Sequence, residues 1–217
     1  MSADLLADFV GADRDRALGV HGSCVDREGH PPVEHRFRAD DRVNVYSVAK
    51  TFTSVAVGPA LGRVIARVTG ADLRSFLLPR LFGPLDLHDP AWHACPLGHP
   101  FAESDLFLRT SELARFARLL AQEGRWNGRQ VVPAAYVRRM TAERVDTSAV
   151  TDREPFTHGY GLGVWIDRGD TYRLDGRYGQ YVVVSPARRA AVTVTAHPER
   201  DEELLAAVHE LVVDRLD

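Results

Sequence analysis

Runs that alternate apolar and polar residues lie at both ends of the chain. Near the N-terminus, residues 33–38 have this pattern, residues 17–25 form another strand-like run, and a turn rich in Gly, Pro and Asp separates the two. The C-terminal third contains four more strand-like runs joined by turn-like segments: residues 160–166, 171–174, 180–185 and 191–196. These runs predict an N-terminal hairpin and a C-terminal antiparallel meander.

Helical periodicity dominates the middle of the chain and returns at its end. The predicted helices cover residues 5–10, 43–58, 61–70, 73–81, 112–123, 133–140 and 202–216. Asn44 or Ser47 is expected to cap the second of these, and Thr110 or Ser111 the fifth. In the third, Leu61, Val64, Ile65 and Val68 have the spacing of one apolar helix face. Residues 82–101 are expected to be a Pro-rich loop.

The order of these elements is a strand hairpin, helices, strands and a helix. Strands that cluster at both ends, without regular alternation with helices, predict an α+β fold. We expect an antiparallel sheet built from both chain ends, with the terminal helices on one face. At 217 residues the chain has the length of one well-buried domain.

The composition narrows the class of protein. Hydrophobic residues make up 45% of the chain and charged residues 26%, which is typical of a globular protein. The formal net charge is −3, which argues against a nucleic-acid-binding protein. No apolar run approaches ~18 residues, so no membrane span is expected. The N-terminus has no signal-peptide pattern, and Cys24 and Cys95 are expected to be thiols, so we expect a cytoplasmic protein.

One lysine stands out among the basic residues. Of 27 Lys and Arg residues only Lys50 is a lysine, and Ser47 lies three positions before it. Residues three apart share a face of a helix, so the amine can reach the hydroxyl. A serine hydroxyl is a weak nucleophile until a base takes its proton. An amine can do this once it is neutral, whereas a guanidinium stays protonated.

The Ser-x-x-Lys pattern can also lack any function, because it is short and occurs by chance. A lone surface lysine needs no chemical role. The residues around the pair favour a buried helix, since Val45, Val48 and Phe52 are apolar. Other candidates are weaker: His88, His93 and His99 share a Pro-rich segment but match no zinc-ligand spacing. We therefore expect no metal site and no cofactor.

The segment Tyr46–Ser54 resembles the nucleophile helix of the β-lactamase-related serine hydrolases. This family includes penicillin-binding proteins, class C β-lactamases, family VIII-type esterases and 6-aminohexanoate-oligomer hydrolases. Further segments resemble the family in the same order along the chain: residues 61–70, 81–87, 110–116, 160–165 and 176–184. The similarity spans roughly residues 17 to 214. It implies a β-lactamase/transpeptidase-like fold.

The resemblance implies roles for particular residues. Ser47 corresponds to the acylated nucleophile and Lys50 to the base beside it. Leu174-Asp175-Gly176 corresponds to the family's third motif, in which Gly176 would let a substrate backbone approach, but Leu174 lacks the usual cationic or imidazole group. The backbone N–H groups of Ser47 and Arg177 would form the oxyanion hole. The guanidinium of Arg177 would also attract a substrate carboxylate, and Tyr178 follows in the same substrate-binding segment.

The family's second motif, Tyr-x-Asn, has no counterpart before Leu61-Gly62. Gly58-Pro59 joins the two helices directly, so the helical lobe that carries this motif is reduced. Tyr46, Tyr160 and Tyr178 are the candidates to replace its tyrosine. The expected single domain combines residues 17–58 and 156–217, which hold the sheet with the nucleophile and terminal helices. Residues 59–155 form the reduced helical region.

Two functions remain open at this point. The first is a serine hydrolase that hydrolyses a small ester, amide or β-lactam through an acyl-enzyme on Ser47, with Lys50 as the base. The alternative is a catalytically impaired or non-enzymatic relative, a scaffold or binding domain, either naturally trimmed or engineered. The expected partner is a small-molecule substrate, with no nucleic acid and no membrane. A homodimer through the face left by the missing lobe is also expected.

Overall fold

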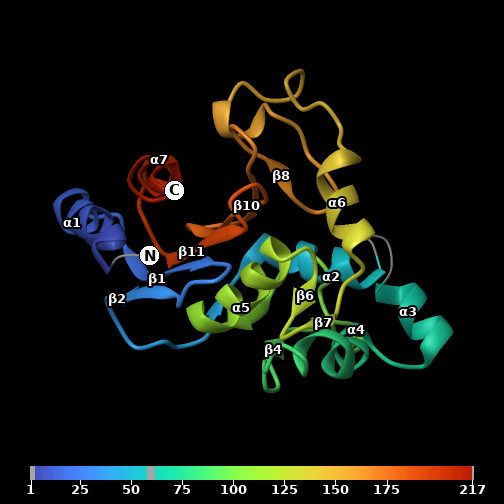
Figure 1. Ribbon diagram of the computed structural model, residues 1–217. Helices are drawn as coiled ribbons and strands as arrows, with labels where there is room; N and C mark the ends of the chain where they lie inside the picture. Colours follow the sequence, from blue (N-terminus) through green and yellow to red (C-terminus); the bar gives the residue numbers. More distant parts are fainter. Residues whose placement is uncertain (1–2, 58–61, 217) are drawn as a thin grey trace.

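The computed structural model describes residues 3–57 and 62–216 (Figure 1). Its centre is a six-stranded antiparallel sheet in the order β2-β1-β11-β10-β9-β8. The strands in chain order are β1 (Val20–Arg27), β2 (Val33–Arg36), β8 (Trp165–Ile166), β9 (Tyr172–Gly176), β10 (Gln180–Ser185) and β11 (Ala190–Ala196).

The two ends of the chain meet in this sheet. Strand β1 pairs with β11, with Val25 opposite Val192 and Cys24 opposite Thr193. Strand β11 is buried along its whole length, since it lies between β1 and β10 and is covered on both faces. The predicted α+β class and the sheet built from both chain ends are therefore confirmed.

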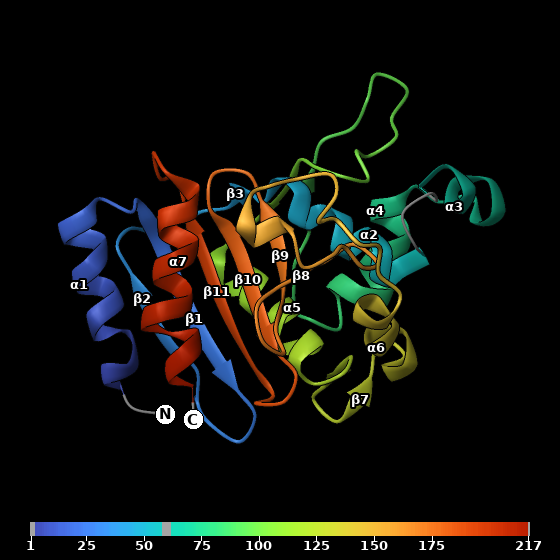
Figure 2. The same ribbon diagram turned by 90° about the horizontal axis from the view of Figure 1, so that it is seen from above.

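The terminal helices lie side by side on one face of the sheet (Figure 2). They are α1 (Ala7–Arg16), preceded by the 3-10 turn η1 (Ala3–Leu6), and α7 (Asp201–Leu211), followed by η5 (Val213–Arg215). Phe9 and Val208 are fully buried between these helices and the sheet. This burial confirms the predicted placement of both terminal helices, although α1 is longer than the helix predicted over 5–10.

The opposite face of the sheet packs against α5 and the helical middle of the chain (Figure 1). The helices are α2 (Ala49–Val57), α3 (Gly62–Thr69), α4 (Leu73–Leu77), α5 (Thr110–Ala121) and α6 (Ala134–Ala142). Shorter turns are η2 (Tyr46–Val48), the π-helical turn η3 (Leu78–Phe82) and η4 (Glu154–Phe156). Two small sheets are β3-β5-β4 and β6-β7, formed by β3 (Val43–Asn44), β4 (Ala91–Trp92), β5 (Leu106–Leu108), β6 (Arg125–Trp126) and β7 (Arg129–Gln130).

The helix predicted over 43–58 begins later than expected. Residues 43–44 form β3, η2 follows, and α2 begins only at Ala49. Asn44 lies outside the helix, and its side-chain oxygen accepts a hydrogen bond from the Tyr46 N–H at 2.8 Å. Similarly, α5 begins at Thr110 rather than at Glu112. At α5 the Arg109 N–H donates to Glu112 inside the helix and the Thr110 N–H donates to Asp40, so neither Thr110 nor Ser111 is the cap that the sequence predicted.

The apolar face predicted for α3 is only partly correct. Ile65 is buried at 3% exposure, but Val68 is 78% exposed. Leu61 and the side chain of Val64 lie outside the described residues, as does the Gly58-Pro59 junction that the sequence places where the lobe is missing.

The strand predicted over 160–166 was wrong in its first part, because only Trp165–Ile166 joins the sheet. Glycines let the preceding backbone pack against helices instead. A Cβ on Gly161 would lie 1.9 Å from the Met140 carbonyl oxygen. Gly163 adopts a φ of +83°, a left-handed conformation that favours glycine. The segment therefore lies against α2 and α6 rather than extending the sheet.

Candidate active site

Ser47 and Lys50 lie side by side where η2 continues into α2. The Lys50 Nζ donates a hydrogen bond to the Ser47 Oγ at 2.8 Å. Hydrogen bonds fix this helix to the glycine-rich segment beside it. Thr51 Oγ1 donates to the Gly163 carbonyl and Ser54 Oγ to the Leu162 carbonyl, both at 2.6 Å. The three-residue spacing therefore brings the amine to the hydroxyl, as the sequence predicted.

The turn before Ser47 is held in an unusual conformation. Tyr46 has a φ of +47°, which is strained for a residue with a bulky side chain. Its ring packs edge to face on Tyr178, with centroids 5.4 Å apart. Tyr178 also has a positive φ, +62°, and its ring stacks on His197 at 4.7 Å. These aromatic contacts join the turn that carries Ser47 to the β9–β10 turn that carries Arg177.

A cavity of about 750 Å³ opens beside the Ser47–Lys50 pair. This volume is within the range of small-molecule sites. Arg177 lines it together with Ser47 and Lys50, so the structure brings these three predicted site residues together. The remaining walls contain aromatic and acidic side chains, among them Tyr160, Trp165, Phe156, Tyr181, Asp175 and Asp201.

Other predicted site residues lie elsewhere. Leu174 is 1% exposed and belongs to the hydrophobic core, so its prediction as a substrate-contacting residue was wrong. Neighbouring residues on a strand face opposite sides of the sheet, and it is Asp175 that lines the cavity. Tyr178 lines a smaller adjacent cavity that shares Arg177 with the first.

Gly176 allows another group to approach the backbone of β9 closely, but that group belongs to the protein and not to a substrate. A Cβ at this position would lie 2.3 Å from the Val45 carbonyl oxygen and 3.2 Å from a Val48 methyl. The role predicted from the resemblance, approach of a substrate backbone, is therefore replaced by packing of β9 against the turn that carries Ser47. This close contact brings Arg177 next to the nucleophile turn.

Sequence reasoning left Tyr160 among three candidates and did not select Asp175. Tyr160 lines the cavity with Ser47 and Lys50. Burial and the negative charge of Asp175 raise the pKa of Tyr160, so its phenol stays protonated. The signal that would have found Asp175 is the alternation of β9, because an inward Leu174 places its neighbour on the other face.

A buried charge network lies behind Asp175. Arg173 is fully buried and its Nε donates to the Asp175 Oδ2 at 3.0 Å. The same guanidinium lies 3.3 Å from the Asp167 Oδ1, and the His209 Nε2 lies 2.9 Å from the Asp167 Oδ2. Burial raises the pKa of Asp175, an effect that the charge of Arg173 only partly opposes. In Asp167, the hydrogen bond from His209 and the charge of Arg173 outweigh burial and lower the pKa.

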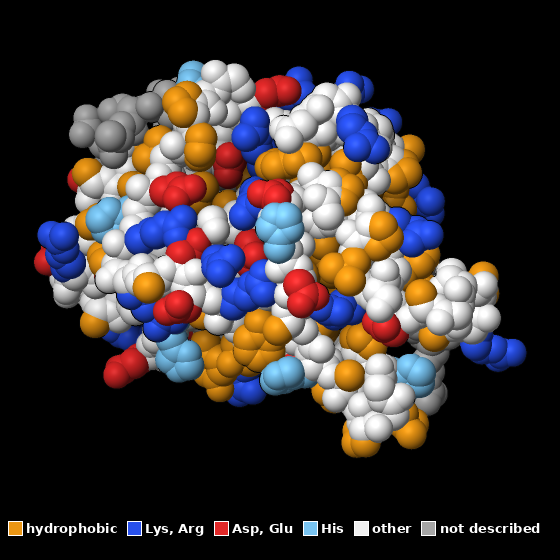
Figure 3. Space-filling model, turned by 90° about the horizontal axis from the view of Figure 1, so that it is seen from below, with side chains coloured by type: hydrophobic (Ala, Val, Ile, Leu, Met, Phe, Trp, Pro, Cys, Tyr) orange, Lys and Arg blue, Asp and Glu red, His pale blue; other side chains and the backbone are white. Residues whose placement is uncertain are grey.

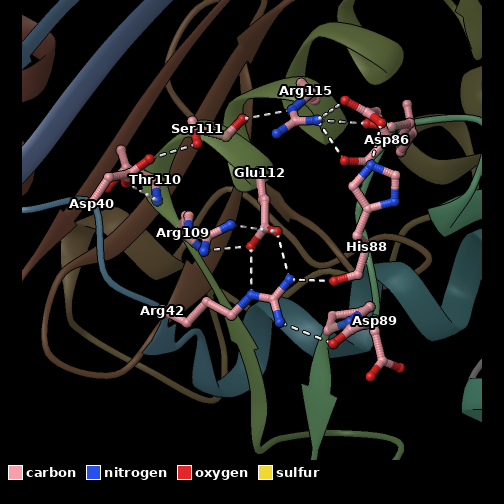
Figure 4. Close-up of polar contacts among 12 residues, drawn as sticks. Asp40, Arg42, Asp86, His88, Asp89, Arg109, Thr110, Ser111, Glu112 and Arg115 are labelled. Atoms are coloured by element: carbon pink, nitrogen blue, oxygen red, sulfur yellow. Dashed lines mark hydrogen bonds and ion pairs between the residues drawn. The ribbon is translucent and has the colours of Figure 1, made fainter.

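A second network anchors the chain just before β3 (Figure 4). Glu112, 2% exposed in its side chain, accepts two hydrogen bonds from Arg42, at 2.7 and 3.0 Å. It also accepts the Arg109 N–H at 2.9 Å. Arg42 reaches on to the carbonyls of His88 and Asp89, at 2.6 and 2.9 Å. Because β3 leads directly to the turn that carries Ser47, this network fixes the position of the backbone that precedes the candidate site.

One face of the molecule carries charges of both signs. In the view from below, basic and acidic side chains are interleaved across the face (Figure 3). Within the described residues, no helix has both the length and the apolar character needed to cross a membrane.

Comparisons with known proteins identify the family of this chain. The sequence model of the Beta-lactamase family matches residues 57–214, most of the chain. That range begins after Ser47 and Lys50. No curated protein matches the sequence.

Solved structures share the fold. SurE aligns with a TM-score of 0.70 at 17% identity, over 97% of this chain and 75% of its own. A D-amino acid amidase from Ochrobactrum anthropi SV3 has a TM-score of 0.71 at 13% identity, covering 97% of this chain and 99% of its own. A penicillin-binding protein from Bacillus halodurans has a TM-score of 0.69 at 12% identity, covering 97% of this chain and 100% of its own. At these identities the likeness shows the fold alone.

Proposed function

Because this chain belongs to the Beta-lactamase family, we propose that it is a serine hydrolase that cleaves a small ester, amide or β-lactam through an acyl-enzyme on Ser47. The observation that carries the proposal is the 2.8 Å contact between the Lys50 Nζ and the Ser47 Oγ at the mouth of a cavity. In its neutral form, an amine at this distance takes the hydroxyl proton as the oxygen attacks a carbonyl carbon.

Charge that develops on the carbonyl oxygen needs hydrogen-bond donors. We assign this role to the backbone N–H groups of Ser47 and Arg177, whose turns are joined by the Tyr46–Tyr178 contact. Tyr160 lies in the same cavity and keeps its proton, so we assign it as a donor to the leaving group. In this role it replaces the tyrosine of the absent Tyr-x-Asn motif. Water then attacks the acyl carbon and gives a proton to the Tyr160 phenolate, while the Lys50 ammonium returns a proton to the departing Ser47 Oγ, so both groups end in their starting states.

Covalent labelling tests this proposal. A fluorophosphonate probe and a labelled penicillin should each add to the protein once, and the adduct should be absent in Ser47→Ala. Intact-mass spectrometry and peptide mapping give the site of addition. Ser148→Ala, a change at an exposed loop serine, is the matched control and should label like the unmodified chain. Absence of any Ser47-dependent adduct would favour the alternative, a non-enzymatic scaffold or binding domain.

We also propose a homodimer through the face where the lobe is missing. Loss of a lobe is expected to expose apolar surface beside the nucleophile helix, and such surface favours association. Sedimentation equilibrium should show a concentration-dependent dimer. A chain that stays monomeric at high concentration and also has a high Tm would contradict the proposal.

A further inference from the structure

The cavity continues from Ser47 along β9 to a wall of aromatic side chains around Asp175. Trp165, Tyr160 and Tyr181 line it there. Trp165 meets the Tyr160 ring edge to face, with centroids 4.7 Å apart. Faces of aromatic rings attract organic cations, and a carboxylate beside them adds direct charge attraction. This wall therefore has the chemistry of a cation site.

The charges behind the wall leave Asp175 incompletely balanced. Asp175 and Asp167 share a single guanidinium, that of Arg173. His209 hydrogen-bonds Asp167, but its Nδ1 is buried without a hydrogen-bond partner among the described residues. The two carboxylates thus share one arginine, and on its cavity side Asp175 can take a cation of a ligand as a further partner.

Positive side chains in the same cavity are engaged elsewhere. Arg153 pairs with Glu202 at 2.7 Å. The Arg177 guanidinium lies over the Tyr178 ring, 5.1 Å from its centre. Lys50 faces Ser47. None of these contacts neutralises Asp175, whose carboxylate also acts on its neighbours by raising the pKa of Tyr160 and of Tyr181 in addition to the effect of burial.

We infer that this cavity holds a subsite for an alkylammonium group on the acyl part of the substrate, and that Asp175 with the ring of Trp165 determines this specificity. The inference rests on the proposed function, which places the reacting carbonyl at Ser47 and the Arg177 N–H. Asp175 lies near the end of β9 and precedes Arg177 by two residues, roughly 7 Å of extended backbone. The ammonium group is therefore expected several bonds away from the carbonyl carbon, beyond the reach of an α-amino group.

A pair of substrates of equal shape tests the charge directly. The 4-nitrophenyl ester of 5-(trimethylammonio)pentanoic acid and that of 6,6-dimethylheptanoic acid differ only in N⁺ against C. The cationic ester should have a kcat/KM at least about tenfold higher, as expected for a carboxylate combined with an aromatic wall. An equal rate, or preference for the neutral ester, would overturn the inference.

Substitutions show which residue causes the preference for the cationic ester. Asp175→Asn keeps the shape of the side chain but removes its charge, so the ratio of kcat/KM for the cationic ester to kcat/KM for the neutral ester should fall to about one. Asp175→Glu should keep a preference for the cation. Asp170→Asn, at an exposed turn position, is the matched control and should leave both rates unchanged. If Asp175→Asn lowers both rates equally, Asp175 serves folding or general activity and not specificity.

A binding measurement separates this inference from the proposed function. Isothermal titration calorimetry with 5-(trimethylammonio)pentanoate and 6,6-dimethylheptanoate needs no turnover. Tighter binding of the cationic acid, lost in Asp175→Asn, would support the subsite even if Ser47 forms no adduct. Labelling of Ser47 without any cation preference in rate or binding would leave the hydrolase proposal intact and overturn the subsite.

Discussion

Exchange of Lys50 for arginine should lower kcat/KM for ester hydrolysis by about three orders of magnitude. Arginine keeps the positive charge and is of similar length, but its guanidinium stays protonated and cannot accept the Ser47 proton. The 2.8 Å contact between the two side chains leaves no room for an intervening group. The rate of fluorophosphonate labelling should fall in parallel, because the same deprotonation precedes addition to the probe.

An exchange of arginine for lysine at a site without an assigned role is the matched control. Arg67 is exposed on α3, so Arg67→Lys adds a lysine far from any assigned role and should leave kcat/KM and Tm unchanged. Circular dichroism and Tm of Lys50→Arg show whether the fold survives the change. If folded Lys50→Arg keeps activity within about threefold while Ser47→Ala abolishes it, Lys50 is not the base and some other group takes the proton.

The sequence predicted those parts of the structure that depend on local periodicity. Alternating residues at both chain ends placed β1 and β11 in one sheet, where they pair. The three-residue spacing of Ser47 and Lys50 placed both on one face, because that relation holds for any helical turn. These inferences needed no knowledge of what packs against each element.

Predictions that depended on the packing partner failed. Val68 fits the apolar face of α3 by spacing, yet no neighbour covers it among the described residues, and it is exposed. Leu174 was aligned with a substrate-binding position, but the pleat of β9 directs it into the core and leaves Asp175 in the cavity. Gly176 was assigned to substrate approach, whereas the Val45 carbonyl occupies that space. For Gly176 the deciding contact comes from a segment distant in the sequence, and for Val68 what decides is that no such contact forms among the described residues.

Exchange of Glu112 for glutamine should lower the free energy of unfolding by about 2–4 kcal/mol. One carboxylate oxygen, Oε2, accepts both from the Arg42 Nε at 3.0 Å and from the Arg109 N–H at 2.9 Å. The other, Oε1, accepts from the Arg42 Nη2 at 2.7 Å. An amide puts an NH₂ group at one of these sites, so a donor faces a donor in either orientation. Thermal unfolding should show a Tm lower by roughly 5–12 °C.

The pH dependence and an exposed control make this prediction specific. Burial alone would raise the pKa of Glu112, but the hydrogen bonds from Arg42 and Arg109 lower it below the usual 4.5. A lowered pKa means that the carboxylate stabilises the fold fully above pH 4.5 and loses this effect as pH falls through the folded-state value. The difference in Tm between the unmodified chain and Glu112→Gln should therefore become smaller below pH 4.5. Glu143→Gln removes the exposed partner of Arg139 and should leave Tm unchanged. An equal loss from both variants would mean that the buried position of Glu112 is unimportant.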